Sequence, residues 1–394
     1  MTDAKHDYTS AATFAGNFKN LWGTASEVAL NLSSPYRARV KKTNDFTGTS
    51  RISAVSLSLG GGRASGSSLP DSNARVVKQA TLSKIEAYGK YVMDRKTLIA
   101  GSDGKGSFER ADKLAIRGTL DGVNLNIERQ CFGDGTLGTL SSVSASGVVY
   151  TCVITAATWI QAKWMVGDYV NIESGNTDKF EVTSITPSTR TVVFTRLSGS
   201  QVPAGGDVVY MQKSEGNELI GYAKVFDTSV TSLYGITKQY GWQPYRVDAA
   251  SATISMDLLA DIAIDVEQNT GRAITEIHAS VDQFKKLLAA NPDPQYFIGN
   301  ATHGEYKMSY KGLKLLSPST NEEIPVLLNR FIHGSKVYLL NTEESELAFA
   351  PQFGWFAEGP QRITGTTEYE YPYGGELAHY VHPAYQAELH TLAQ

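Results

Sequence analysis

The hydrophobic pattern of this chain is organised around one long helical stretch, SFERADKLAIRGTLDGVNLNIERQCFG, at 107–133. Apolar side chains recur there in steps of three and four, at Ile116, Leu120, Val123, Ile127 and Cys131. This spacing predicts one apolar face of an amphipathic helix. Ser107 is the expected N-cap, and Gly133 stands where a left-handed C-terminal residue is favoured. A helix of about 24 residues would span roughly 36 Å.

Two glycines interrupt this helix one turn apart, at Gly118 and Gly122. Each glycine costs a helix interior about 1 kcal/mol relative to alanine. We therefore expect another part of the structure to approach the helix backbone closely at these positions.

The chain before the helix predicts two extended limbs. Residues 1–44 carry too little apolar surface to fold alone, so we expect an arm that lies on another surface. Residues 45–100 predict a long hairpin whose tip, Gly60 to Asn73, cannot bury enough apolar surface to order itself. Its GGG run predicts a flexible turn, because the helix and the Lys-Ser/Thr pair of a phosphate-binding loop are missing. The return strand is expected to carry Val76, Val77, Leu82, Ile85, Tyr88, Tyr91 and Val92.

The sequence after the helix predicts a turn, then an inserted β domain, and then a mixed region of strands and helices. A glycine-rich turn with Gly133, Asp134, Gly135 and Gly138 ends the helical region 101–140. Short β-type runs then predict an inserted barrel or sandwich of five or six strands at 141–213. Residues 214–375 predict a strand in NELIGYAKVFD and two helices, SMDLLADIAIDVEQNTG and VDQFKKLLAAN. Further strands are expected at 273–279, 311–315, 324–329, 336–341 and 347–350, followed by an aromatic hairpin in TTEYEYPYGGELAHYV and a final strand within 376–394.

Composition limits the classes of protein that fit. A chain of 394 residues is too long for one core and predicts two or three domains. Only 19% of the residues are charged, while Gly (36) and Tyr (20) are abundant, which favours a β-rich protein with much surface buried against partners. The net charge of −4 implies no strong overall attraction to nucleic acid. For Cys131 and Cys152, two free thiols are favoured over one disulfide. We expect neither a secretion signal nor a membrane-spanning run.

No residue pattern predicts catalysis, a metal site or a cofactor site, so we expect a protein that is not an enzyme. Most histidines are scattered: His278, His303, His333, His379, His382 and His390. Glu376, His379 and His382 come closest to a metal cluster, but their spacing suits a helix better than the expected strand. For two charged runs a solvated surface is the favoured interpretation. The alternatives are a cation or basic-partner site at Asp257, Asp261 and Asp265, and contact with acidic neighbours or packaged nucleic acid at Arg37, Arg39, Lys41 and Lys42.

The order of these elements resembles the major capsid proteins of tailed bacteriophages, which have the HK-ninety-seven-like fold. The stretches that carry the resemblance are NIERQCFGDGTLGTL, AITEIHASVDQFKKL and NRFIHGSKVYLLNTEESELAFAP. The resemblance implies an α+β fold made of an N-terminal arm (1–44), an extended E-loop hairpin (45–100), the spine helix of the P domain (101–140), an inserted small β-barrel or sandwich domain (141–213), an A domain with returning P-domain strands (214–375) and a C-terminal strand (376–394).

The resemblance also implies a function. The chain would be a major capsid protein that self-assembles into hexamers and pentamers of an icosahedral or prolate shell around packaged double-stranded DNA. It would be made in the host cytoplasm and reside in the virion. The implied partners are copies of itself, a separate scaffolding protein, a portal, a candidate decoration protein and DNA contacted non-specifically, with no membrane.

Some members of this family join subunits through an E-loop lysine. The predicted tip holds Arg63 but no lysine, and Lys78, Lys84 and Lys90 lie on the return strand, so covalent cross-linking is not expected. Two alternatives stay open. An encapsulin-type nanocompartment shell has the same fold, and a β-rich carbohydrate-binding protein could stack sugars on Trp159, Trp164, Trp242 and Trp355.

Overall fold

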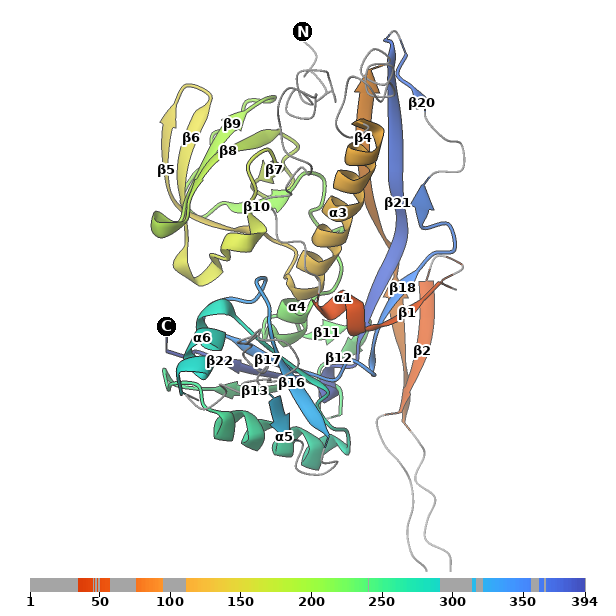
Figure 1. Cartoon of the computed structure of the whole chain (residues 1–394), viewed down its shortest axis with the longest axis vertical. Helices are drawn as coiled ribbons and strands as arrows, with labels where there is room; N and C mark the ends of the chain where they lie inside the picture. The colour runs from red at the N-terminus through yellow and green to blue at the C-terminus, as the bar shows by residue number, and fades with distance from the viewer. Residues whose placement is uncertain are drawn as a thin grey trace, which may run out of the picture.

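The structure is a computed structural model, and it describes the chain in segments. The described residues are 35–44, 46, 48, 50–56, 76–94, 111–239, 241–290, 314–316, 322–355, 361–364 and 366–393. Most of the predicted arm, the hairpin tip at 60–73, Ser107 and His303 lie outside them. Figure 1 shows a barrel and a lower lobe on one side, and a long helix backed by long strands on the other.

The long helix is α3 (Ala111–Phe132), and it lies along a sheet built on one long strand. This strand, β21 (Glu368–Val381), pairs antiparallel with β4 (Ile85–Asp94) over ten positions. The same sheet includes β18 (Ser345–Phe349), β19 (Gly354–Trp355), β20 (Gln361–Arg362) and β1 (Lys41–Thr43), which pairs parallel with β18. A five-residue helix, α1 (Pro35–Arg39), precedes β1.

The predicted one-sided helix is only partly observed. From Ile127 onward every residue of α3 is buried, including the polar run Glu128, Arg129 and Gln130. The helix end is therefore enclosed on all sides rather than on one apolar stripe. Gly133 does not take the left-handed backbone that was predicted for it, and the first positive φ after the helix is at Gly135, at 95°.

The close approach that is expected at the helix glycines occurs instead at a glycine of strand β4, which packs against the helix. A Cβ added at Gly118 or Gly122 would meet no atom within 4 Å. A Cβ added at Gly89 of strand β4 would lie 2.5 Å from Cγ2 of Val123 and 3.2 Å from Cγ2 of Thr119. The strand glycine is what allows α3 to pack against the sheet, and the helix glycines face open space.

The hairpin is shorter than predicted. Strands β2 (Ser50–Ser56) and β3 (Val77–Ser83) pair antiparallel, with Ser50 opposite Ser83. The predicted return strand continued to Val92, but the chain leaves the hairpin after Ser83 and enters the large sheet as β4. The change of partner follows from side-chain burial, because Tyr91 and Val92 are buried in the large sheet, where β4 pairs with β21.

The region of short β-type runs forms a closed six-stranded barrel. Its strands, in the order in which they pair, are β10 (Val208–Met211), β5 (Gly138–Ser146), β6 (Val149–Ile154), β9 (Thr191–Arg196), β8 (Phe180–Thr186) and β7 (Tyr169–Ile172). Its interior is filled by fully buried side chains such as Tyr150, Phe180 and Phe194. Three 3-10 turns lie between these strands, at Ala156–Thr158, Gln161–Lys163 and Pro187–Thr189.

The lower lobe is a second six-stranded sheet with its own core. Its strand order is β13 (Tyr245–Asp248), β22 (Ala387–His390), β17 (Val337–Leu340), β14 (Glu276–Ala279), β16 (Glu323–Leu328) and β15 (Lys314–Leu316). Helices α5 (Met256–Thr270) and α6 (Val281–Ala290) pack against it, and the turn Pro383–Tyr385 precedes β22. Ser255 caps α5 by accepting a hydrogen bond from the Leu258 N–H, and Gly271 ends the helix at φ 68°, so both ends agree with the predicted stretch SMDLLADIAIDVEQNTG.

Two sequence predictions in this half of the chain are wrong. The expected strand in NELIGYAKVFD is a short helix, α4 (Tyr222–Phe226), followed by the small hairpin β11 (Ser232–Leu233) and β12 (Ile236–Thr237). The expected aromatic hairpin is instead the single strand β21. Its Gly374 has φ 144°, and a Cβ there would lie 2.1 Å from the Ala87 carbonyl oxygen, so this glycine permits close strand pairing rather than a turn.

Candidate functional surfaces

The histidines that the structure describes do not form a metal site. No group of three metal-ligating side chains occurs among the described residues. His379 is buried, its Nδ1 lies 2.7 Å from the Ile220 carbonyl oxygen, and its Nε2 lies 2.8 Å from the Tyr36 hydroxyl. Burial lowers the pKa of His379 to about 4, so the ring is neutral. Because a carbonyl can only accept, Nδ1 carries the proton and Nε2 accepts from Tyr36. Glu376 instead pairs with Lys84 at 2.6 Å.

The short helix α1 is fixed in place by polar contacts from three directions. Oε1 and Oε2 of Glu128 on α3 accept hydrogen bonds from the backbone N–H groups of Tyr36 (3.2 Å) and Arg37 (3.1 Å). The Tyr36 hydroxyl reaches His379, and Arg39 pairs with Glu276 of β14 at 3.3 Å. Helix α1 therefore links the long helix, the large sheet and the lower lobe. The sequence signal for this contact is the polar run 128–130 inside an otherwise apolar helix end.

The two segments that connect the barrel to the rest of the chain are clamped together by a buried ion pair. Arg129, at the end of α3, contacts Glu218, beyond β10, through Nη2–Oε1 at 2.5 Å and Nη1–Oε2 at 3.2 Å. The two side chains are 5% and 3% exposed. Close by, a Cβ added at Gly221 would lie 2.3 Å from the carbonyl oxygens of both Gln130 and Gly133. The segment entering the barrel and the segment leaving it thus run in direct contact.

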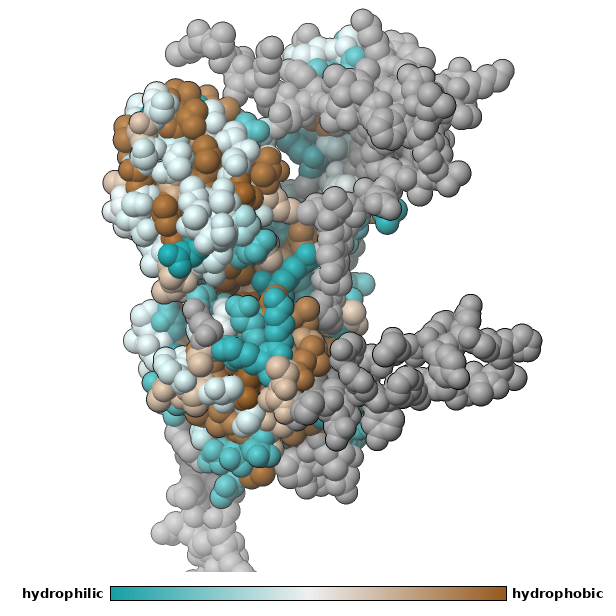
Figure 2. All heavy atoms as spheres, turned by 60° about the vertical axis from the view of Figure 1, so that its left-hand side comes forward, coloured by the Kyte–Doolittle hydropathy of each residue, from teal (hydrophilic) through white to brown (hydrophobic). Residues whose placement is uncertain are grey.

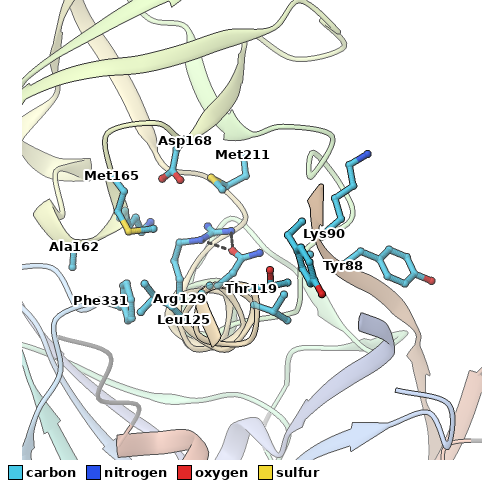
Figure 3. Close-up of a pocket in the computed structure, with 17 residues that line it drawn as sticks. Tyr88, Lys90, Thr119, Leu125, Arg129, Ala162, Met165, Asp168, Met211 and Phe331 are labelled. Carbon is cyan, nitrogen blue, oxygen red and sulfur yellow. Dashed lines mark hydrogen bonds between the residues drawn. The ribbon is translucent and has the colours of Figure 1, made fainter. Parts of the chain in front are cut away.

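A pocket of about 480 Å³ lies between α3, β4 and the barrel. Figure 3 shows Asp168 and Met211 on the barrel side, with Arg129 and Thr119 on the helix. Gly118 and Gly122 also line the pocket. Burial raises the pKa of Asp168 to about 6. The helix glycines therefore border a pocket that the described part of the chain leaves open.

The hairpin β2–β3 has one buried face and one exposed face. Val55, Ala80 and Leu82 point inward and are buried. All eight side chains of the opposite face are exposed, namely Ser50, Ile52, Ala54, Ser56, Val77, Gln79, Thr81 and Ser83. Ile52 is 59% exposed and Val77 is 48% exposed. These two large apolar side chains lie opposite Thr81 and Ser56 on the exposed face.

The remaining candidate residues lie apart. Of the four tryptophans considered for sugar stacking, Trp242 and Trp164 belong to two different cores and are 0% and 5% exposed, so these two provide no platform for sugars. Asp257 and Asp261 are exposed on α5, whereas Asp265 accepts from the Tyr245 hydroxyl at 2.7 Å. Lys41, Lys42 and Lys78 are exposed, and Lys90 pairs with Glu370.

Cys131 and Cys152 are buried as free thiols, as predicted, in different hydrophobic clusters. Burial raises the pKa of Cys152 to about 12 and raises that of Cys131 as well.

Among the residues that the structure describes, no helix combines the length and the apolar character needed to cross a membrane. Figure 2 shows hydrophilic residues gathered where the barrel lobe meets the lower lobe.

Comparison with solved structures decides the fold. A chain of the cyanophage A-1(L) capsid asymmetric unit matches with a TM-score of 0.57 and 11% identity, over 95% of this chain and 97% of that chain. A chain from the capsid of a native GTA particle matches with a TM-score of 0.51 and 11% identity, over 98% and 99%. This chain has the capsid-protein fold. The resemblance to tailed-phage capsid proteins that the sequence predicts is thus confirmed at the level of the fold.

Other comparisons add little to this result. A chain of an encapsulin complex from Synechococcus elongatus also matches, with a TM-score of 0.45 and 9% identity over 97% of this chain and 95% of that chain. Neither the protein-family models nor the curated proteins give a match. The α+β class with the capsid-protein fold is therefore established by structure alone.

Proposed function

We propose that this chain is a major capsid protein that assembles into hexamers and pentamers of a closed shell around packaged double-stranded DNA. The observation that carries the proposal is the match to a cyanophage capsid chain over nearly the full length of both chains. The exposed face of the hairpin supports it, because a single chain leaves Ile52 and Val77 on this face uncovered. In the virion, the copies of the protein would cover it for one another.

In this proposal the elements take the roles that the family resemblance implies. The β2–β3 hairpin is the E-loop, and α3 is the spine helix of the P domain, together with β4 and β21. The six-stranded barrel is the inserted domain, and the lower lobe is the A domain. The hairpin of one copy lies on a neighbouring copy, where Ile52 and Val77 lose their exposure to water. A scaffolding protein and a portal complete the set of proposed partners.

Burial of the hairpin face contributes measurably to assembly. Burying a large aliphatic side chain from water is worth about 1.5–3 kcal/mol, and many such contacts per shell act together. The expected product of expression is therefore a closed particle or free hexamers and pentamers, visible by electron microscopy. Nucleic acid inside particles from a producing host would support the phage role, and a cargo enzyme would support the nanocompartment.

The matched test substitutes exposed apolar residues on two surfaces. I52S/V77S removes the apolar face of the hairpin, and V202S removes an apolar side chain that is 64% exposed on the barrel. We expect I52S/V77S to retain the native circular dichroism spectrum and to lose particle formation. V202S should assemble like the unmodified chain. Normal shells from I52S/V77S would contradict the assigned role of the hairpin, and a stable monomer from the unmodified chain would contradict the proposed function.

A further inference from the structure

One strand of the barrel has an edge that no other strand covers along its second half. Strand β10 pairs with β5 only at the first two residues of β5. The last contact on this side is at Leu140, whose N–H donates to the Asp207 carbonyl oxygen and whose carbonyl oxygen accepts from the Gly206 N–H, both at 2.8 Å. Beyond Leu140, β5 continues to Ser146 and, among the described residues, pairs only with β6. Figure 1 shows this strand on the side of the barrel away from α3.

The geometry of the hairpin decides which backbone groups face the uncovered edge. A two-residue turn joins β5 to β6, and its first residue, Gly147, has φ 66°, as in the type II′ turn of a tight hairpin. The residues that flank such a turn, Ser146 and Val149, exchange hydrogen bonds, and hydrogen-bonded pairs then alternate along the ladder. Val143 and Ala145 fall on the other positions, so their N–H and C=O groups point away from β6. No described residue forms a backbone hydrogen bond with these four groups.

The next strand of the barrel supports this alternation independently. The Arg196 N–H donates to the Val148 carbonyl oxygen at 2.8 Å, so Val148 directs its carbonyl toward β9. Tyr150, two residues further on, directs its backbone groups the same way. Val149 therefore directs its groups toward β5, where its partner is Ser146. The same assignment of inward and outward groups thus holds on both sides of β6.

The uncovered edge carries little of what usually protects a strand from pairing. Edge strands in proteins commonly carry lysine, proline or a bulge. The irregularity in the pairing of β5 lies between Leu140 and Ser142, before the free groups. The edge sequence SSVSAS contains neither a charge nor a proline, and no Asp, Glu, Lys or Arg occurs from 135 to 162. Ser144 and Ser146 are small and exposed, so another backbone can approach without a steric or electrostatic barrier.

The free backbone groups are complementary to themselves, which favours a second copy of the same strand. Antiparallel strands exchange hydrogen bonds where the groups of both residues face the partner. If two copies of β5 lie antiparallel about a two-fold axis through Ser144, Val143 of each copy faces Ala145 of the other. All four free groups of each copy are then paired. The absence of charge also avoids the like-charge repulsion that opposes the pairing of a charged strand with itself.

We propose that β5 joins two copies of the protein by antiparallel pairing about Ser144, so that two barrels share a continuous sheet. This inference rests on the proposed function, because so short a pairing is weak by itself and becomes effective where a shell repeats it many times. The contact uses the same surface on both copies, whereas a ring of six or five copies is built from head-to-tail contacts. The pairing therefore links copies that belong to neighbouring hexamers or pentamers.

Disulfide trapping in assembled particles tests the register of this pairing. The two Ser144 residues form a non-hydrogen-bonded pair with Cα atoms about 4.5 Å apart, which is within the range of a disulfide. S144C particles treated with copper phenanthroline should give a covalent dimer of the chain on non-reducing gel electrophoresis. S146C is the matched control, because Ser146 is also exposed but its two copies lie about 14 Å apart at a rise of about 3.4 Å per residue. Cys131 and Cys152 are buried, so the unmodified chain should give no dimer.

An exchange of charge identifies the partner as a second copy. S144K and S144E each place two like charges opposite one another at the axis. At low salt, and at the lowest concentration that allows the unmodified chain to assemble, each should lower the yield of particles about fivefold or more. A 1:1 mixture of the two variants should recover most of this yield. S146K, whose added charge lies opposite Ser142 of the other copy, should assemble like the unmodified chain.

Three outcomes would overturn the inference. S144C particles that give no dimer would exclude the pairing while the proposed function stands. Equal dimer yields from S144C and S146C would show chance contact between barrels without a fixed register. A loss of particles in S144K that S144E does not recover would assign the edge to an extended segment of a different protein. If the unmodified chain forms no particles, the proposed function fails, and the dimer yields of S144C and S146C in the concentrated soluble chain decide the pairing separately.

Discussion

The buried ion pair between Arg129 and Glu218 provides the sharpest test of how the barrel is attached. The pair joins the segment that enters the barrel to the segment that leaves it, and both side chains are almost fully buried. Glu218→Gln removes the negative charge and keeps the shape of the side chain. The positive charge of Arg129 then stays buried without its counter-charge. We expect this single change to loosen the junction between the barrel and α3.

The size of the effect follows from the contacts. Removing one partner of a buried ion pair typically costs about 3–5 kcal/mol. The Asn126 side-chain oxygen still accepts from Nε (3.0 Å) and Nη2 (2.8 Å) of Arg129, which places the expected loss at the lower end, about 3 kcal/mol. This corresponds to roughly a hundredfold larger unfolded population. Asp121→Asn, in the exposed pair of Arg117 and Asp121, should cost only about 0.3–0.5 kcal/mol.

Urea unfolding of the unassembled chain, followed by tryptophan fluorescence, measures these differences. Trp159 and Trp164 stack on each other in the barrel at a ring-centroid distance of 6.3 Å and report on its unfolding. R129M/E218L removes both charges and should recover at least half of the stability lost in E218Q, because no unpaired charge remains. If E218Q destabilises the barrel no more than D121N does, the ion pair does not hold the junction and this reasoning fails.

Three further predictions follow from individual positions. Gly118→Ala and Gly122→Ala should each increase the free energy of unfolding of the unassembled chain by about 1 kcal/mol and so raise its melting temperature, because nothing lies within 4 Å of the added Cβ. Slower assembly of either variant, followed by light scattering, would show that another copy packs there. Gly374→Ala should destabilise the chain by about 2 kcal/mol or more in a thermal melt, because the new Cβ meets the backbone oxygen of the neighbouring strand at 2.1 Å; an unchanged melting temperature would contradict the described pairing. Burial raises the pKa of Glu128 from 4.5 to about 6, so the folded chain binds this proton more tightly than the unfolded chain. The free energy of unfolding should therefore fall by about 2 kcal/mol as pH rises from about 4.5 to 6. Urea titrations should show a smaller decline in Glu128→Gln, and an unchanged decline would refute the assignment.

Local signals predicted the elements whose ends are set by their own residues. Helix α5 begins at the cap Ser255 and ends at the left-handed Gly271, as the sequence indicates, because capping is a short-range effect. The barrel was also recognisable, since its short β-type runs and the turns between them lie within the segment itself. Its first strand was not, because β5 begins at Gly138, inside the predicted glycine-rich turn. The fold class then followed from the order of the elements, which the comparisons confirm.

The errors arose where distant parts of the chain decide the structure. YPYGG has the composition of a turn, but β4 lies so close to Gly374 that the strand continues straight through it. Gly118 and Gly122 suggested a close approach to the helix backbone. The close approach of helix and strand occurs at Gly89 instead, because a glycine in either partner can make room for the other. The contact of Glu128 with α1 could not be predicted from sequence, since only the fold brings Glu128 and the backbone of Tyr36, 92 positions apart, together.

The two faces of the hairpin bear on how the proposed shell would assemble. Its inward face is fixed by Val55, Ala80 and Leu82 and by the hydrogen bond from the Thr81 N–H to the Tyr234 carbonyl oxygen, at 2.8 Å. These contacts set the direction of the hairpin, but its outward face contributes nothing to stability while water covers it. Two-stranded hairpins are only marginally stable by themselves. In the proposed shell, a copy that covers the outward face would stabilise the hairpin and the assembly through the same contacts, so folding of this limb and association of the copies would be coupled.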